Sequence, residues 1–374
     1  MAKVKKVLII GGGIGGLSAA IALRRVGIAV DLVEIQPNLT VYGVGIIQHG
    51  NVVRAMAHLG LLDKYLNKAF AFEDVVQYTA NGDFVARVAG HRLAGANYPA
   101  NVGISRLELH KVLIASAEEW GAHLRFGLTV DLLEQAAAEV NARFTGGVEG
   151  TYDLVVGADG VHSKVRSMIF GDDLKPRYTG QSVWRYNFLR APEIDHLATF
   201  AGPRGNAGLC PLAHDLMYMF LTSSEPGNPR MPLERLPELF RARLLPFGGI
   251  VARLREQIVA PAEVVYRPLE VLMLPSPWYR GRVLLIGDAA HTTTPHLGQG
   301  AGMAIEDAVV LADLLDQDLG LDTALERFME RRFERCKFVV ESSILIGEWE
   351  MQNKRDVDRF DLVKRMMEVS AAPI

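Results

Sequence analysis

Residues 7–16 read VLIIGGGIGG, in which four apolar residues lead directly into the pattern G-x-G-x-x-G. A short continuous apolar run is typical of a parallel strand that is buried on both faces. Apolar residues at helical spacing follow from Leu17 to Val26, and Gly27 ends them. Because the glycine pattern is informative only between a strand and a helix, this context predicts the first βαβ unit of a dinucleotide-binding domain.

The glycines and the next strand indicate the class of nucleotide. Gly11 permits a tight turn, Gly13 lets the backbone approach a pyrophosphate, and Gly16 lets the helix pack closely on the strand. Residues 28–33 predict a second strand, and Glu34 stands at its end, 18 residues after Gly16. An acid there accepts hydrogen bonds from a ribose hydroxyl and disfavours a 2′-phosphate. We therefore expect FAD or NAD rather than NADP, and this motif alone leaves FAD and NAD open.

The composition excludes several other classes of protein. A net charge of −3 over 374 residues argues against a nucleic-acid surface and favours small neutral or weakly acidic partners. Cys210 and Cys336 are too few for a disulfide framework or a metal cluster, which fits a reducing cytoplasm. The uncharged stretch Val7–Leu23 contains five glycines and is shorter than the ~20 apolar residues that span a bilayer. We therefore expect neither a signal peptide nor a membrane segment.

The texture of the chain changes between its segments. Short aromatic-rich runs separated by Pro and Gly at 178–267, together with alternating residues at 75–88, predict an antiparallel sheet. The charged stretch from Thr323 predicts a solvated helical cover. We expect an α/β fold in which a Rossmann-like FAD-binding domain is interleaved with an antiparallel-sheet substrate domain and followed by C-terminal helices. The expected boundaries are 1–74, 101–177 and 268–335 for the first domain, 75–100 and 178–267 for the sheet domain, and 336–374 for the C-terminal helical segment.

Three helices are expected beside the glycine-rich segments and after Ser105. One runs roughly from Asn51 to Leu62, and one starts at about Gly302. Another follows Ser105, where Glu108 three residues on completes a capping box.

Two further motifs place an aspartate directly after an apolar strand. They are GADG at 157–160 and GDAAH at 287–291, which supply Asp159 and Asp288. Such carboxylates can bond the hydroxyls of a sugar or a ribityl chain lying over the strand ends, or they can serve as turn residues and helix caps. Together with Glu34, Asp159 and Asp288 make three carboxylates, which is more than the binding of NAD requires. FAD, a longer ligand with a ribityl chain, accounts for all of them.

These motifs carry a family resemblance. GGGIGG with Glu34, DLVVGADGVHSKVR at 153–166, and RGRVLLIGDAAHTTTPHLGQGAGMAIEDAVVLADLL at 280–315 resemble the single-component FAD-dependent aromatic hydroxylases. These are the p-hydroxybenzoate hydroxylase-like flavoprotein monooxygenases. The resemblance spans nearly the whole chain and is weakest at 178–267 and after residue 335. In texture the chain is similar to urate, salicylate, 6-hydroxynicotinate and quinolone hydroxylases.

The resemblance implies an activity. In that family NAD(P)H reduces the flavin, dioxygen adds to form a flavin hydroperoxide, and the distal oxygen is transferred to an electron-rich ring. It implies FAD as cofactor, NAD(P)H as a transient co-substrate, dioxygen, and a small phenolic or N-heteroaromatic substrate, in a monomer or homodimer. No second strand-bounded G-x-G-x-x-G follows Gly16, which agrees with transient NAD(P)H binding. A flavin-linked reductase or dehydrogenase without oxygen transfer, or a non-catalytic FAD-binding protein, stays open.

The resemblance also implies which residues hold FAD. Gly15 would lie against the pyrophosphate, Arg106 would reach FAD, and Asp288 would bond the ribityl chain. The loop 295–302 would lie along the isoalloxazine, its backbone amides stabilising negative charge on the reduced ring. Asp159 and Arg166 are associated with FAD and with the nicotinamide pyrophosphate. The full expected set is Gly11, Gly13, Gly15, Gly16, Glu34, Ile35, Ile47, Arg106, Val130, Asp159, Asp288, Pro295, Gly298, Gln299, Gly300, Ala301 and Gly302.

Two residues are the expected catalytic pair. His296, between Pro295 and the GQG loop, can accept a hydroxyl proton or bond a ring oxygen. Hydroxypyridine-type relatives carry a similar Pro-His, and the alternative is a histidine bonded to backbone in a tight loop. Tyr218 matches a pocket tyrosine of the urate enzymes, although it can also be a core residue.

Other side chains of the predicted sheet are open to either a substrate role or a structural one. Trp184, Tyr186 and Cys210 lie on strands that are expected to face the flavin. Asn206 stands where urate hydroxylases have an arginine, which argues against urate. Arginines that can bind a carboxylate, but are expected to be surface or structural residues, are Arg185, Arg190 and Arg204, and His291 is expected to be structural.

Overall fold

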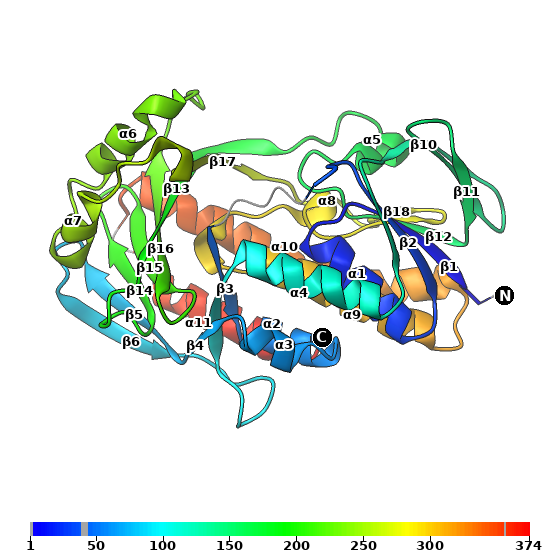
Figure 1. Ribbon diagram of the computed structural model, residues 1–374, viewed down its shortest axis with the longest axis horizontal. Coiled ribbons are helices and arrows are strands. Elements are labelled where there is room, and N and C mark those ends of the chain that lie inside the picture. Colours follow the sequence, from blue (N-terminus) through cyan, green and yellow to red (C-terminus); the bar gives the residue numbers. More distant parts are fainter. Residues whose placement is uncertain (1–2, 39–43, 355–356) are drawn as a thin grey trace.

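The computed structural model describes residues 3–38, 44–354 and 357–374. Figure 1 shows a parallel sheet with its helices on the right and a second, larger sheet on the left, with long helices running between them. The longest is α10 (Leu321–Met351), which packs against α9 (Gly300–Asp316) at one end of its course and against strand β13 (Arg177–Leu189) at the other. The expected α/β architecture, with its interleaved sheets and C-terminal helices, is confirmed.

The sheet on the right of Figure 1 has the strand order β18-β19-β12-β1-β2-β8 and is parallel except for its edge strand β18, which is antiparallel to β19. Within it, β1 pairs in parallel with both β12 and β2, and β12 pairs in parallel with β19. The three motifs GGGIGG, GADG and GDAAH follow β1, β12 and β19, so they meet at one edge of the sheet. The strands are β1 (Lys6–Ile10), β2 (Ala29–Glu34), β8 (His123–Phe126), β12 (Leu154–Gly157), β18 (Tyr279–Arg280) and β19 (Val283–Leu285).

Two helices that begin at glycine motifs, α1 (Ile14–Arg25) and α9, pack against each other beside this sheet. Helix α1 starts within the GGGIGG turn, and an added Cβ on Gly15 would lie 3.2 Å from the Cβ of Ala304 in α9. Helix α9 begins at Gly300, two residues before the expected start. Because both helices start at the same edge of the sheet, their first backbone amides face the same space.

The second sheet has seven strands in the order β17-β13-β16-β15-β14-β5-β6, and all neighbours are antiparallel except the parallel pair β14 and β5. Its outer face packs on helices α6 (Leu236–Arg243) and α7 (Gly249–Arg255), with Trp184 and Tyr186 in that core. These two rings therefore point away from the expected flavin side. The other strands are β5 (Asp74–Thr79), β6 (Phe84–Ala89), β14 (Leu197–Ala201), β15 (Asn206–Pro211), β16 (Leu216–Ser224) and β17 (Val265–Val271).

Several local expectations differ from the structure. The helix expected over 51–62 is two helices, α2 (Gly50–His58) and α3 (Leu62–Leu66), because Gly60 adopts φ +70° between them. Helix α4 (Arg106–Glu119) follows Ser105 as expected, but the Ser105 side chain makes no capping hydrogen bond. The boundary expected between residues 335 and 336 falls inside α10, which is continuous.

The remaining elements are small. Strands β3 (Gly45–His49), β7 (Asn101–Ser105) and β4 (Phe70–Phe72) form one three-stranded sheet, and β9 (Val130–Gln135), β10 (Val140–Phe144) and β11 (Glu149–Tyr152) form another. The last helices are α5 (Lys164–Phe170), α8 (Asp288–His291) and α11 (Arg359–Ala371), and 3-10 turns cover Leu233–Arg235, Pro261–Glu263 and Pro295–Leu297.

The stretch from Thr323 is helical as expected, but the long helix α10 that it forms is more buried than a solvated cover would be. Helix α10 buries Arg332, Cys336 and Glu350 along one side, so the expectation that this helix is solvated is wrong.

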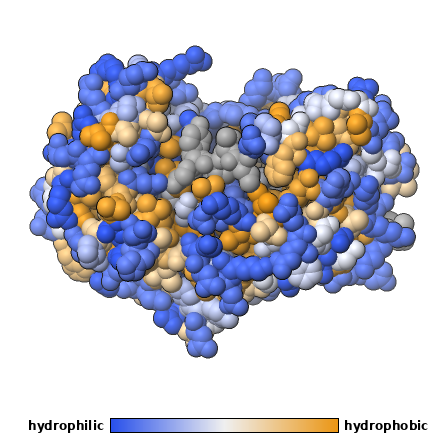
Figure 2. Space-filling view, in the orientation of Figure 1, coloured by the Kyte–Doolittle hydropathy of each residue, from blue (hydrophilic) through white to orange (hydrophobic). Residues whose placement is uncertain are grey.

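On the face shown in Figure 2, apolar residues are scattered among hydrophilic ones. Within the described residues, no helix has both the length and the apolar character needed to cross a membrane.

Candidate cofactor and substrate site

A cavity of about 470 Å³ lies where the three motifs meet the inner face of the seven-stranded sheet. Its walls come from the GGGIGG turn, the loop after β12, helix α8, the loop before α9, strand β3 and the first turn of α4. Of the expected site residues, the lining contains Gly13, Gly15, Ile47, Arg106, Tyr218, Asp288, Pro295, Gly298, Gly300 and Ala301. Residues far apart in the chain therefore converge on one space.

The glycines of the first turn fall into two kinds. An added Cβ on Gly11, which has φ +111°, would overlap the carbonyl oxygen of Ala158, and one on Gly16 would overlap the carbonyl oxygen of Gly11. A Cβ on Gly13 would meet nothing within 4 Å. The fold itself thus requires Gly11 and Gly16, whereas Gly13 keeps open a space beside the N-terminus of α1, where a pyrophosphate binds in such folds.

Glu34 lies beside this turn. Its Oε2 accepts a hydrogen bond from the Gly12 amide at 2.7 Å, and its Oε1 accepts one from the Gln36 amide at 2.8 Å. The adjacent Ile35 is 62% exposed. The carboxylate is therefore fixed at the end of β2, in a position suited to a ribose hydroxyl.

We expect Glu34→Gln to weaken FAD binding about tenfold, because a hydrogen bond to a charged acceptor contributes about 1.5–3 kcal/mol. The amide keeps one oxygen for the Gly12 amide and loses the bond from the Gln36 amide at the exposed end of β2, so the turn should stay folded. Titration of FAD fluorescence measures the affinity, with Glu139→Gln, an exposed residue outside the cavity, as the matched control. Equal affinities for the two variants would show that Glu34 does not bind the ribose.

Asp159 supports the cavity wall from outside the lining. Its Oδ1 accepts from the Ser163 hydroxyl at 2.5 Å and its Oδ2 from the Val165 amide at 3.0 Å, at the start of α5. Burial raises the pKa of Asp159, and these hydrogen bonds oppose that effect. Arg166 donates to three backbone carbonyls, including that of Ala289 at 3.0 Å. Both side chains therefore bond groups of the protein around this loop. For Asp159 this agrees with the second reading of the sequence, in which the aspartate caps a helix.

Asp288 and Arg106 face the cavity from different elements. Asp288 is the first residue of α8, and its side chain is exposed to the cavity. The protein atoms around the cavity reduce its hydration and so raise the pKa of Asp288, while His291 and Arg106 oppose the rise. Burial lowers the pKa of Arg106, and Tyr218 and Asp288 counteract it. An acceptor and a donor of hydrogen bonds are therefore available to one extended ligand.

The loop before α9 presents its backbone to the cavity and its side chains to the protein. Pro295, Gly298, Gly300 and Ala301 line the cavity. Gln299 instead exchanges hydrogen bonds with Asn51 of α2, at 2.9 and 3.3 Å, and an added Cβ on Gly302 would lie 2.9 Å from Val52. The amides at the N-terminus of α9 are thus held toward the cavity, where they favour a negatively charged group.

Of the two expected catalytic residues, only Tyr218 lines the cavity. Burial raises the pKa of Tyr218, and the nearby guanidinium groups of Arg185 and Arg106 oppose the rise. The buried His296 ring lies behind the wall, where Nδ1 is 2.7 Å from Oγ1 of Thr294 and Nε2 is 3.2 Å from Oε2 of Glu350. Val130 likewise lies away from the lining, buried at the start of β9.

Two more residues line the cavity: His110, which the sequence did not single out, and Arg185, which was expected to be a surface or structural arginine. Arg185 lines the cavity from the middle of β13, where burial and the charge of Arg106 lower its pKa to about 10. His110 lies one turn after Arg106 on α4, and burial lowers its pKa to about 4. Two features of the sequence could have indicated these positions. Arg185 follows Trp184 on a strand and so lies on the opposite face of the sheet, and His110 is four residues after Arg106 and so lies on the same face of the helix.

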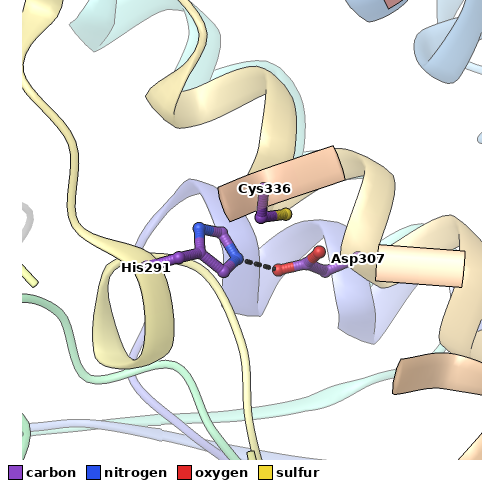
Figure 3. A group of neighbouring side chains, drawn as sticks. All are labelled: His291, Asp307 and Cys336. Atoms are coloured by element: carbon purple, nitrogen blue, oxygen red, sulfur yellow. Dashed lines mark hydrogen bonds and ion pairs between the residues drawn. The ribbon is translucent and has the colours of Figure 1, made fainter. Parts of the chain in front are cut away.

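A buried ionic cluster holds the GDAAH segment in place (Figure 3). Asp307 of α9 accepts hydrogen bonds from His291 Nε2 at 2.6 Å, from the Gly287 amide at 2.9 Å and from Arg332 Nε at 2.7 Å. Burial alone would raise the pKa of Asp307, but His291 and Arg332 hold it at about 2. Cys336 lies 3.4 Å from Arg332, whose guanidinium already supplies the cation that a metal would provide. His291 is thus placed in a structural ion-pair network.

Comparison with known proteins decides the family. The family described as FAD binding domain matches residues 5–343. The chain belongs to this family. Aurachin C monooxygenase/isomerase from Stigmatella aurantiaca is 32% identical over 352 residues, which cover 92% of this chain and 90% of that protein. An FAD-dependent urate hydroxylase of Klebsiella pneumoniae is 31% identical over 350 residues, covering 90% and 88%.

A solved structure shows the same architecture with a cofactor. Klebsiella pneumoniae HpxO complexed with FAD and uric acid superposes with a TM-score of 0.85 and 26% identity over 99% of this chain and 97% of that one. The expected flavoprotein family and FAD as cofactor are confirmed. The cavity thus offers an extended ligand such as FAD an open space at Gly13, the carboxylate of Asp288 and the backbone amides at the N-terminus of α9.

Proposed function

We infer that this protein is an FAD-dependent monooxygenase that uses NAD(P)H and dioxygen to hydroxylate a small phenolic or N-heteroaromatic compound. The observation that carries the inference is the single cavity in which the N-termini of α1 and α9 face an inner sheet surface carrying Tyr218 and Arg185. One end of this cavity suits a dinucleotide, and the other is walled by an aromatic ring and a guanidinium. Monooxygenase relatives that align over about nine-tenths of the chain support it.

FAD, when bound, supplies the hydride acceptance and oxygen activation that side chains lack. The protein's own contribution is placement. The amides of α1 would bind the pyrophosphate, Glu34 the ribose and Asp288 the ribityl chain. The amides at the start of α9 would stabilise negative charge on the reduced ring. Tyr218 and Arg185 would orient the substrate against the ring, in a buried space that limits access of water.

The proposed substrate differs from that of the solved relative. HpxO was crystallised with uric acid. Here Asn206, which the family resemblance places where urate enzymes have an arginine, donates its amide to Glu350 Oε1 at 2.6 Å and is occupied within the protein. We therefore favour a phenol or a hydroxylated N-heterocycle over urate. We also propose a monomer or homodimer in a reducing cytoplasm, in keeping with two free, buried cysteines.

Oxygen incorporation is the deciding experiment. The FAD-loaded protein is given phenols, hydroxypyridines, quinolones and urate, with NADH or NADPH and isotopically labelled dioxygen. We expect at least one compound to stimulate NAD(P)H oxidation and to gain one labelled oxygen atom, as seen by product mass. Stimulated oxidation without label would indicate the reductase or dehydrogenase alternative. Absence of stimulation by every compound would favour a non-catalytic FAD-binding protein.

A further inference from the structure

A line of hydrogen bonds leads from the cavity wall into the protein. Thr294 lines the cavity, and its Oγ1 lies 2.7 Å from Nδ1 of His296. On the other side of the ring, Nε2 lies 3.2 Å from Oε2 of Glu350 in α10. Thr294 is 1% exposed, and the side chains of His296 and Glu350 are 2% and 3% exposed. The three groups are therefore shielded from bulk water.

Glu350 is held by the seven-stranded sheet. Its Oε2 accepts from Thr222 Oγ1 at 3.0 Å and from Gln181 Nε2 at 3.3 Å, and its Oε1 accepts from Asn206 Nδ2 at 2.6 Å. These donors come from β16, β13 and β15, so three strands fix one carboxylate. Such a carboxylate accepts from the Nε2–H of His296, which leaves Nδ1 with a free lone pair toward the Thr294 hydroxyl.

We propose that Thr294, His296 and Glu350 form a proton relay that takes the proton of a hydroxyl group bound in the cavity. The order hydroxyl, imidazole, carboxylate is the one by which a Ser-His-Asp triad moves a proton. Thr294 is the member that touches the substrate. His296 is the base behind it, and Glu350 is a positioning residue that sets the tautomer of the ring.

The proton transfer balances within these groups. The O–H bond of the substrate breaks and its proton bonds to Oγ1 of Thr294, while the original hydroxyl proton of Thr294 bonds to Nδ1 of His296. The products are a substrate oxyanion and an imidazolium whose Nε2–H remains on Glu350. Arg185 in the same cavity favours the anion. Proton return after release restores the starting state.

The ligand class follows from this chemistry. A relay that ends in a hydroxyl suits an aromatic O–H, or the ring N–H of its lactam tautomer. The inference rests on the proposed function, since an oxyanion enriches the ring in electrons for attack on an electrophilic oxygen. It also explains how His296 can act without lining the cavity.

The test uses 4-nitrophenol, whose phenolate absorbs visible light, bound to the FAD-loaded protein without NAD(P)H. We expect the apparent acid dissociation constant of bound 4-nitrophenol to be about tenfold larger than that of 4-nitrophenol in solution. A shift of this size is typical of one neighbouring group that stabilises the charged form. Glu350→Gln, His296→Asn and Thr294→Val should lose this shift, and Thr294→Ser should keep it. Glu348→Gln, an exposed carboxylate on the same helix, is the control that should match the wild type.

Each outcome decides the proposal. Failure of the wild type to bind or ionise 4-nitrophenol would overturn it, and so would equal shifts in Glu350→Gln and Glu348→Gln. FAD affinity and the melting temperature show which variants are folded, and Thr294→Val alone carries the test if Glu350→Gln does not fold. Because no oxygen chemistry is involved, a shift without oxygen incorporation in the labelling experiment would overturn the proposed function and leave the relay standing.

Discussion

Replacing Gly13 by Ala should prevent tight FAD binding while leaving the FAD-free protein folded. The backbone at Gly13 has φ −74° and ψ −176°, which alanine adopts readily, and an added Cβ meets no protein atom within 4 Å. The same methyl group would occupy the space beside the N-terminus of α1 that the pyrophosphate needs. We expect the affinity to fall on the order of 100-fold, or about 2.7 kcal/mol. Fluorescence titration with FAD measures the loss.

Gly16→Ala is the contrasting variant. Its Cβ would overlap the carbonyl oxygen of Gly11, so the change should lower the free energy of unfolding as well as FAD affinity. Gly13→Ala should melt within a few degrees of the wild type in the absence of FAD, since a compatible Gly-to-Ala change alters stability by only ~0.4–1 kcal/mol. If Gly13→Ala binds FAD as the wild type does, the pyrophosphate does not lie at this turn.

Arg332→Met should destabilise the protein by about 3–5 kcal/mol, the range for removing one partner of a buried ion pair. Arg332 is fully buried and bonds Asp307 at 2.7 Å and Glu306 at 2.8 Å. The variant leaves both carboxylates in the interior without this guanidinium. Urea unfolding of the FAD-free protein measures the difference. Arg331→Met, at a partly exposed pair with Asp313, is the control and should cost less than about 1 kcal/mol.

The effect of Arg332→Met should also depend on pH. The pKa of Asp307 in the fold is about 2, below its ordinary value of 3.8, although burial alone would raise it. A depressed carboxyl pKa contributes stability that is complete above the unfolded value and is lost as the pH falls toward the folded one. The difference in unfolding free energy between the wild type and Arg332→Met should therefore become smaller as the pH is lowered from about 4 to 2. A constant gap, or a cost no greater than that of Arg331→Met, would contradict this role.

Most of the predictions made from the sequence depended on the spacing of residues that are close together in the chain. The run VLIIGGGIGG, the acid at Glu34 and the aspartates after two later strands identify a nucleotide site because each feature depends on a few neighbouring residues. Asp159 marks the limit of such reasoning. A carboxylate after a strand can bind a ligand or cap a helix, and only the structure shows both of its oxygens engaged at the start of α5.

Orientation and long-range partners were decided by tertiary structure. Alternation along β13 shows that Trp184 and Arg185 lie on opposite faces, but α6 and α7, which follow later in the chain, determine which face is the core. His296 meets Glu350 across 54 residues, and its role as base or as loop anchor depends on that contact. Sequence spacing thus predicted a dinucleotide site and the turn that receives it, and the resemblance of the three motifs predicted the family and FAD. Packing between distant elements decided what stands at the substrate end, because a side chain acquires its neighbours only when the sheets and helices come together.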